Sequence, residues 1–385
     1  MPEQGRIIDL FAGAGGWDEG LRELGHRALG VDFDALACAT AKAAGHERLH
    51  TDIASLDPSA FGPVWGLIGS PPCQAYSTAG LKAGRTDKPH VIACAHELAA
   101  GHDTRAERRD QCKDERSLLT VEPLRWAMEL RPRWVALEQV PGVLELWTMF
   151  ADLLAANGYQ TTVGVLSAER YGVAQTRKRA YLIASLDGPV RLPEPTHRSY
   201  NSRRPTEVRE DERHLLPWVS MADALGWPGG GTSWANNQTQ GGKRPRGLSR
   251  SMDCPARTLD TASGSWTVER CEGRRHRDPA TGSRCPHWTA RRPATTILTK
   301  GLVSAPGARD RDPNWRPGDK WPSQWTGAER ITPEQAAILQ GFRRDYPWQG
   351  ARTRQFAQIG NAVCPPVGRR VLAEAMAPSR RRRPQ

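Results

Sequence analysis

The chain has 385 residues, of which 38% are hydrophobic, so it can build one large domain with its own core and a second, smaller one. Its apolar runs fall short of the ~18 residues of a membrane-spanning helix, and the start, "MPEQGRIIDL", lacks the basic and apolar segments of a signal peptide. We therefore expect no membrane contact and a cytoplasmic location. The net charge of +12, from 54 basic and 42 acidic residues, favours a polyanionic partner, with nucleic acid first. A GC-rich genome would also enrich arginine, so that explanation of the charge stays open.

Short apolar runs predict strands at 6–11, 28–32, up to about Asp52, 64–70, 133–140, near 160–167 and 179–185. Helices are expected between them, at 17–25, 34–45, 118–130 and around 145–157. This alternation predicts an α/β fold with a doubly wound, mostly parallel sheet and helices on both faces. Ligands of such a sheet bind at the carboxyl ends of the strands.

The composition changes after about residue 187, where the chain becomes rich in Pro, Arg, Gly and Trp and loses its periodicity. We interpret this stretch as an irregular second domain rather than a disordered one, because tryptophan recurs through it. Two helices are expected beyond it, at 332–342 and about 365–377.

A glycine-rich turn, "DLFAGAGGWDEG" (9–20), joins the first strand to the first helix. Small residues let the backbone approach a ligand closely, but Asp18 stands where a dinucleotide-binding motif needs glycine. Asp32 and Asp52 end the next two strands, suited to a ribose and to an adenine amino group. Together these features predict a cofactor that contains a nucleoside.

Eight cysteines occur without a CxxC pair, which predicts reduced thiols. Cys73 lies in "GSPPCQAYS" (69–77), where two prolines at the end of a strand restrict the backbone, and it is the candidate nucleophile. The histidines and cysteines between 90 and 112 match no zinc-finger spacing, so no metal is predicted.

Six motifs occur in order from residue 7 to about 370: "DLFAGAGG", "GSPPCQAYS", "LEQV", "QTRKRAYLI", "RPATTI" and "QIGNAV". In this order the chain resembles the DNA (cytosine-5) methyltransferases. The resemblance implies S-adenosyl-L-methionine as cofactor and double-stranded DNA as partner. It also implies a catalytic domain at 1–187, a target-recognition domain at 188–352 and a return to the catalytic domain at 353–385.

By this resemblance Phe11 stacks near the adenine, Asp32 holds the ribose, Asp52 contacts the adenine, and Leu119 and Asn361 close the pocket. The whole implied cofactor set is Phe11, Ala12, Gly13, Gly15, Trp17, Asp32, Phe33, Asp52, Ile53, Pro72, Leu119, Asn361 and Val363.

The resemblance also gives the catalytic residues their roles. Cys73 adds to C6 of a cytosine that has left the helix, which makes C5 able to take a methyl group. Glu138, which should carry or share a proton, contacts N3 and the exocyclic amine, and Arg179 contacts O2. Arg177 supports the loop. In this chain Gln139 stands where the family usually has Asn, and Cys364 stands where Pro is expected, which we interpret as a packing change.

Contacts to DNA are predicted in two regions. The stretch 81–115 is longer than in typical relatives, and the resemblance implies that it is a loop that closes over DNA. Its cations, which we expect to face phosphates, are Lys82, Arg85, Lys88, Arg105, Arg108 and Arg109. Residues from about 188 to 290 are expected to select the target sequence. The predicted DNA-binding set is Gln74, Ser77, Lys82, Arg85, Arg244, Arg246, Arg250, Arg274 and Arg275.

Two other functions stay open at this point. An RNA cytosine-5 methyltransferase would use the same thiol chemistry, and a catalytically weakened DNA-binding relative is suggested only by Gln139. A nicotinamide dehydrogenase is disfavoured by the glycine pattern. We expect a monomer of bacterial or phage origin. Whether a cognate restriction endonuclease is a further partner stays open.

Overall fold

The computed structural model of the chain describes residues 5–72, 83–201, 204, 207–227, 232–235, 249–251, 255–257, 266–269 and 328–381. In the described residues, no helix combines the length and the apolar character needed to cross a membrane.

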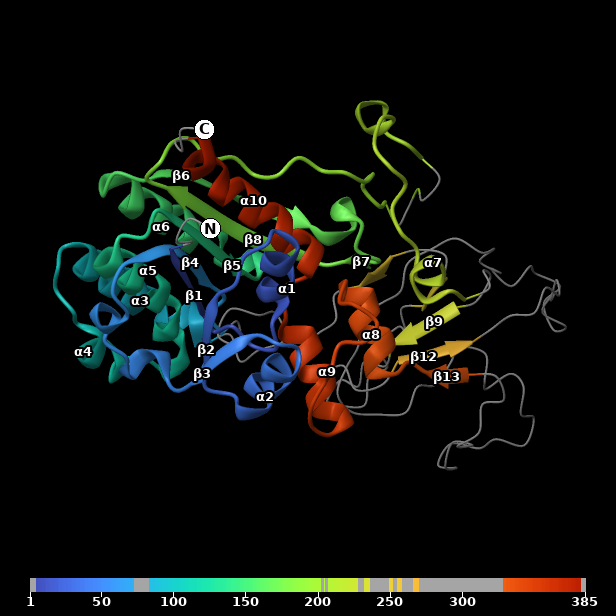
Figure 1. Cartoon of the computed structure of the whole chain (residues 1–385), viewed down its shortest axis with the longest axis horizontal. Helices are drawn as coiled ribbons and strands as arrows, with labels where there is room; N and C mark the ends of the chain where they lie inside the picture. The colour runs from blue at the N-terminus through green and yellow to red at the C-terminus, as the bar shows by residue number, and fades with distance from the viewer. Residues whose placement is uncertain are drawn as a thin grey trace, which may run out of the picture.

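A seven-stranded sheet forms the centre of the larger part of the molecule (Figure 1). Its order is β3 (Glu47–His50), β2 (Leu29–Asp32), β1 (Arg6–Leu10), β4 (Val64–Gly69), β5 (Trp134–Gln139), β8 (Lys178–Ser185) and β6 (Gln160–Ser167). Only β8 runs antiparallel to its two neighbours, so the predicted doubly wound, mostly parallel sheet is confirmed. The strand order reverses at β1, because β2 lies on one side of it and β4 on the other. The carboxyl ends of β1 and β4 therefore form the switch point where such sheets bind ligands.

Helices cover both faces of this sheet. One face buries Ile8 and Leu182 under α3 (Ala83–Ala99), α5 (Glu122–Leu130) and α6 (Leu144–Ala156). The opposite face buries Ile7 and Tyr181 under α1 (Gly16–Glu23) and α10 (Pro365–Arg381). Adjacent strand residues point to opposite faces, so near-continuous apolar strands are what two covered faces require. The last helix, α10, contacts α1, β5 and β8, which ties the end of the chain to its beginning (Figure 1).

The rest of the described chain lies beside this sheet, to the right in Figure 1. It holds a four-stranded sheet in the order β10 (Ser249–Ser251), β9 (Thr232–Ala235), β12 (Trp266–Glu269) and β13 (Ala328–Arg330). A two-stranded sheet pairs β7 (Gln175–Thr176) with β11 (Ala256–Arg257). The helices here are α7 (Met221–Leu225), α8 (Pro333–Gln340) and α9 (Arg352–Asn361), while α2 (Ala35–Ala43) follows β2 in the larger part. Helix α8 confirms the helix expected at 332–342, with a Thr332–Gln335 capping box at its start and Gly341 at its end.

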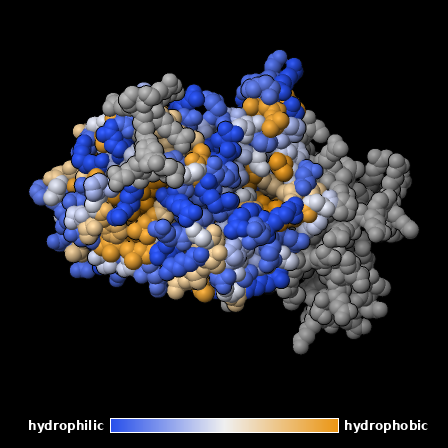
Figure 2. Space-filling view, viewed as in Figure 1, coloured by the Kyte–Doolittle hydropathy of each residue, from blue (hydrophilic) through white to orange (hydrophobic). Residues whose placement is uncertain are grey.

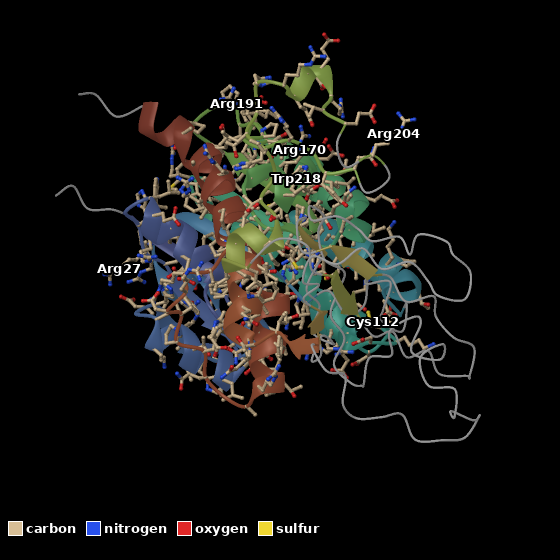
Figure 3. All side chains as sticks on the ribbon, turned by 90° about the vertical axis from the view of Figure 1, so that its right-hand side faces the viewer. Arg27, Cys112, Arg170, Arg191, Arg204 and Trp218 are labelled. Atoms are coloured by element: carbon tan, nitrogen blue, oxygen red, sulfur yellow. The ribbon has the colours of Figure 1, made fainter. Side chains whose placement is uncertain are left out.

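The Pro- and Arg-rich segment that follows β8 has little regular structure, as expected, but a buried carboxylate organises it. Glu212 is 3% exposed at its side chain and accepts hydrogen bonds from Arg170 at 2.8 Å and from the hydroxyl of Ser199 at 2.7 Å. Trp218 packs edge-on against Tyr200. Figure 3 shows Arg204 on the outer part of this segment, with Arg170 and Trp218 nearer to the body of the molecule.

The loop predicted at 81–115 is wrong for much of its length, because 83–99 form α3 and Arg105–Arg109 form α4. Val91, Cys94, Ala95 and Leu98 recur at helical spacing and are buried in the core. Three of the cations expected to face phosphates have acidic partners instead. Lys88 pairs with Glu145, Arg105 with Glu122 and Arg108 with Glu97. On the face shown in Figure 2, hydrophilic residues predominate, and hydrophobic residues gather over the left-hand half of the molecule.

Candidate active site

The glycine turn after β1 has the backbone of a ligand cradle. Phe11 (φ 59°), Gly13 (φ 54°) and Gly15 (φ 107°) all have positive φ, and a non-glycine residue such as Phe11 adopts this conformation only where its surroundings impose it. A Cβ on Gly13 would meet no atom within 4 Å, so the space beside this residue is open to a ligand. A Cβ on Gly15 would lie 2.5 Å from the Tyr346 hydroxyl, and one on Gly16 2.3 Å from the Val363 carbonyl. Gly15 and Gly16 are therefore required by packing within the protein, whereas Gly13 borders the cradle.

Asp32 fixes this turn against the end of β2. Its carboxylate accepts hydrogen bonds from the backbone N–H groups of Gly13 and Asp34, each at 2.8 Å. Burial raises the pKa of Asp32 above its usual range, although these two N–H groups act in the opposite direction. A carboxylate oxygen has a second lone pair, so Asp32 can still accept a hydrogen bond from a ligand hydroxyl.

Apolar and polar groups that suit a nucleoside follow on the neighbouring strand ends. Phe33 is 68% exposed after β2, an unusual exposure for a large apolar side chain, and Phe11 packs half-buried against the core. Asp52 is exposed after β3, where it accepts the Ala54 N–H at 3.0 Å, and Ile53 beside it is buried. An open cradle with acceptors and an exposed aromatic ring fits an adenosine group.

The residues just before the predicted nucleophile, Cys73, are fixed by several hydrogen bonds. Cys73, Gln74, Ser77 and Lys82 lie outside the described residues. Immediately before them, Ser70 donates its N–H to the Leu10 carbonyl at 3.1 Å and accepts the Trp17 indole N–H at 2.8 Å. The Pro71 carbonyl accepts the side-chain amide of Gln139 at 2.5 Å. Gln139 is 2% exposed and its own oxygen accepts the Val140 N–H at 2.6 Å. The Gln that departs from the family pattern therefore supports the turn that leads to Cys73.

Glu138 is the last residue but one of β5 and lies opposite Tyr181 of β8. It is 5% exposed, and its carboxylate lies 3.0 Å from Nε of Arg179. Arg177 lies deeper, 3% exposed, where it donates to the Gly360 carbonyl at 2.8 Å and its own carbonyl accepts the Ala168 N–H. The structure thus pairs Glu138 with Arg179 and uses Arg177 to join this region to the end of α9.

The other predicted cofactor residues occupy varied positions. Trp17 and Val363 are buried in the core under α1 and α10. Leu119 is half-buried, and Asn361 is exposed at the end of α9. Cys364 is buried, and burial raises the pKa of its thiol to about 11, which suits the packing role expected for it. Arg244, Arg246, Arg274 and Arg275 lie outside the described residues, as do the side chains of Arg85 and Arg250.

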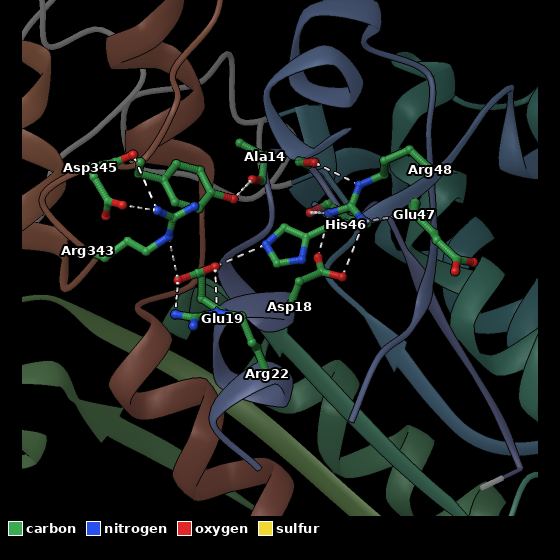
Figure 4. Close-up of polar contacts among 12 residues, drawn as sticks. Ala14, Asp18, Glu19, Arg22, His46, Glu47, Arg48, Arg343 and Asp345 are labelled. Carbon is green, nitrogen blue, oxygen red and sulfur yellow. Dashed lines mark hydrogen bonds and ion pairs between the residues drawn. The ribbon is translucent and has the colours of Figure 1, made fainter. Parts of the chain in front are cut away.

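The sequence did not reveal the charged support under the turn. Arg48 of β3 is fully buried at its side chain, donates to the Gly13 carbonyl at 3.2 Å and forms a 2.5 Å ion pair with Asp18 of α1 (Figure 4). Asp18 was the one sequence signal for this ion pair, since a carboxylate in the first turn of a buried helix requires a partner. In the sequence it stands out only because it occupies the place of a glycine.

Asp9 of β1 lies beside this pair and is fully buried. Neither carboxylate oxygen has a hydrogen-bond partner among the described residues. Burial and the nearby Asp18 raise the pKa of Asp9 well above its usual range, against the opposing effect of Arg48. The carboxyl group therefore stays protonated at a pH where it would ionise in the unfolded chain.

We expect Asp9→Asn to change how stability depends on pH. A raised native pKa means that wild-type stability falls as pH rises from the unfolded pKa, near 4, towards the native value, by roughly 1.4 kcal/mol for each pH unit between the two. Asn is neutral at every pH, so the variant should lack this fall and exceed the wild type in stability at pH 8. Chemical unfolding between pH 4 and 9 measures both curves. Parallel curves for the two proteins would show that Asp9 ionises normally in the fold.

A sheet in this order, with a ligand cradle at the switch point and acids on the next two strand ends, has the S-adenosylmethionine-dependent methyltransferase fold. The chain matches the family described as C-5 cytosine-specific DNA methylase over residues 5–94 and 104–377. It belongs to that family, whose methyl donor is S-adenosyl-L-methionine.

Individual relatives support this family assignment. The type II methyltransferase M.AgeI of Thalassovita gelatinovora is 33% identical over 244 residues, which are 57% of this chain and 50% of that protein. M.NgoMIV of Neisseria gonorrhoeae is 24% identical over 376 residues, 94% of this chain and 95% of that protein. The match thus spans about half the length of M.AgeI and nearly all of M.NgoMIV. The crystal structure of S. pombe Dnmt2 methyltransferase shares the fold, with a TM-score of 0.55 at 13% identity over 98% of this chain and 99% of that chain.

Proposed function

We propose that the chain transfers a methyl group from S-adenosyl-L-methionine to C5 of a cytosine in double-stranded DNA, at a short specific sequence. One observation carries the proposal: the adjacent residues Glu138 and Gln139 connect the two halves of the site. Glu138 pairs with Arg179 at 3.0 Å, and Gln139 holds the Pro71 carbonyl two residues before Cys73. The residues that lead to Cys73 and the acid Glu138 thus lie at the carboxyl ends of the neighbouring strands β4 and β5, next to the cradle at the switch point, which supports the proposal.

Each residue has a distinct task in this proposal. The Cys73 thiolate forms a bond to C6 of the flipped cytosine, and the electron pair of the C5–C6 double bond moves towards C5 and N3. Glu138 donates a hydrogen bond to N3, which accommodates that charge, and Arg179 holds O2. Bound S-adenosyl-L-methionine would supply the electrophilic methyl group that bonds to C5, and its sulfonium sulfur would become a neutral thioether as the sulfur–methyl bond breaks. A base then removes the proton from C5, and the bond between C6 and the sulfur breaks to restore the thiolate.

The cofactor would be held by Asp32, Asp52, Phe11 and Phe33. Gly13 would line its methionine end. The family's match favours DNA over RNA as the acceptor. The relatives named as type II methyltransferases support the further proposal of a cognate restriction endonuclease. We keep the monomeric state, the cytoplasmic location and target selection by residues 188–290 as proposals on the same basis.

Bisulfite sequencing of DNA from cells that express the chain tests the reaction. We expect protected cytosines at one short sequence. A parallel assay with labelled S-adenosyl-L-methionine should mark duplex DNA and leave RNA unlabelled. Labelling of RNA alone would favour the RNA methyltransferase, and labelling of neither would favour the weakened DNA-binding relative.

Asp32→Ala should weaken cofactor binding much more than DNA binding. The change removes the proposed ribose acceptor and the group that orients the Gly13 N–H, so we expect the Kd for S-adenosyl-L-methionine to rise about tenfold or more. Calorimetry measures this affinity, and a gel shift without cofactor measures DNA binding. Asp57→Ala is the matched control, because Asp57 caps a short turn on the surface by accepting the Ser59 N–H. An unchanged Kd in Asp32→Ala would refute the ribose role.

A further inference from the structure

Three consecutive carbonyl groups of the glycine turn accept hydrogen bonds from side chains outside the turn. Arg48 donates to the carbonyls of Ala12 and Gly13, at 3.5 and 3.2 Å. The hydroxyl of Tyr346 donates to the next carbonyl, that of Ala14 (Figure 4). The Gly13 N–H donates a hydrogen bond to the Asp32 carboxylate. Together with the three carbonyl contacts, this bond fixes the orientation of the peptide groups on both sides of Gly13.

Tyr346 comes from the other part of the molecule, in the segment 341–350 that follows α8. This segment continues from β13, which pairs with β12 in the four-stranded sheet. Tyr346 is 4% exposed and packs against Phe342 and Trp348, with ring centroids 4.7 and 4.9 Å away. Its position is therefore set by the core of that part.

A second contact from the same segment reaches α1. Arg343 lies 3.5 Å from the carboxylate of Glu19, and its guanidinium lies 5.3 Å from the centre of the Tyr346 ring. Glu19 is buried and also lies 3.1 Å from Nε2 of His46. The contact of Tyr346 with Ala14 thus lies next to the ion pair of Arg343 with Glu19, which joins the segment to the first turn of α1 and is drawn in Figure 4.

We propose that Tyr346 is a positioning residue for the cofactor, which holds the glycine turn in its binding conformation from the target-recognition part of the chain. The inference rests on the proposed function, since it assumes that the turn at Gly13 binds S-adenosyl-L-methionine. The turn needs positive φ at Phe11, which is unfavourable without outside support. Loss of the Tyr346 hydroxyl leaves the Ala14 carbonyl buried without this donor and lets the turn relax.

Tyr346→Phe tests the proposal, because it removes one oxygen and keeps the ring in its aromatic cluster. We expect the Kd and the KM for S-adenosyl-L-methionine to rise about five- to tenfold. The kcat at saturating cofactor and the KM for DNA should stay within about twofold of the wild type. If Tyr346 only stabilised the fold, its loss would not raise the KM for S-adenosyl-L-methionine selectively over the KM for DNA.

The chain offers a matched control in Tyr159→Phe. Tyr159 is 2% exposed and donates its hydroxyl to the Pro132 carbonyl at 2.8 Å, just before β5 and therefore at the amino end of that strand. It should lose a similar amount of stability with no change in cofactor affinity. An unchanged Kd in Tyr346→Phe, or an equal rise in both variants, would overturn the proposal. A wild type that does not bind S-adenosyl-L-methionine would instead refute the proposed function.

Hydrogen exchange of the wild type gives a second measurement if Tyr346→Phe does not fold. Bound S-adenosylhomocysteine should slow exchange in peptides from 341–350, because the ligand and Tyr346 stabilise the same turn conformation. Peptides around Tyr159 should not change. Exchange in 341–350 that is indifferent to the ligand would contradict the role of Tyr346.

Discussion

Cys73→Ser is expected to lower methyl transfer by at least about 10³-fold while DNA and cofactor still bind. A serine hydroxyl is far less acidic than a thiol and is a much weaker nucleophile towards C6 of a neutral pyrimidine ring. The backbone before this residue should be unchanged, because Gln139 holds the Pro71 carbonyl and Ser70 binds the Leu10 carbonyl. Single-turnover transfer of a labelled methyl group to duplex DNA measures the loss.

A covalent step predicts more than lost activity. DNA that contains 5-fluorocytosine has no C5 proton to remove, so the wild type should remain attached to it under denaturing conditions and Cys73→Ser should not. Cys112→Ser is the matched control, because Cys112 is half-buried and burial raises the pKa of its thiol to about 11. It should be trapped like the wild type. Substantial turnover by Cys73→Ser would exclude the covalent mechanism.

The order of strands and helices could be predicted because each apolar run in the first half of the chain is short and flanked by helical periodicity. The run at 133–140 shows this, since it became β5 in the middle of the sheet. The helix α3 was missed although Val91, Cys94 and Leu98 have helical spacing. Its two histidines and one cysteine, His90, Cys94 and His96, belong to the group that matches no zinc-finger spacing. Among the residues that the structure describes, no three metal-binding side chains come together.

The residues that support the cradle could not be predicted, since their partners are distant in sequence. Arg48 and Asp18 are 30 residues apart, and Tyr346 and Ala14 are 332 apart. Only the fold brings these pairs together. The strand-end acids were visible because the sheet itself places Asp32 and Asp52 at one edge. Local sequence thus indicates what faces the ligand, whereas tertiary contacts determine what holds that surface in shape.

Gln139, which departs from the family pattern, supports the site through two hydrogen bonds. The longer side chain reaches the Pro71 carbonyl and also receives the Val140 N–H, so both ends of its amide are used. This contact removes the main reason to regard the chain as a weakened relative. It also leaves Glu138, one residue earlier, as the group on β5 that is available to act on the base.

Glu138→Gln is expected to slow methyl transfer by at least about 10²-fold, the usual scale for the loss of an acid–base group. The substitution keeps the size and planar shape of the side chain but removes the ability to deliver a proton to N3. It also replaces the carboxyl oxygen that lies 3.0 Å from Nε of Arg179, so Arg179 is expected to lose its orientation towards O2. Single-turnover rates at saturating DNA and cofactor measure the chemical step, and calorimetry should find the same cofactor affinity as in the wild type.

Glu129→Gln is the matched control for this change. Glu129 is exposed on α5, so this variant makes the same substitution away from the site, and its rate should stay within about twofold of the wild type. The position of the lost proton can be tested further, because a cytosine analogue that is more easily protonated at N3 should recover part of the rate in Glu138→Gln and none in Cys73→Ser. A near-normal rate in Glu138→Gln would mean that another group protonates N3, and the pair of Glu138 with Arg179 would then serve only to close the end of β5 against β8.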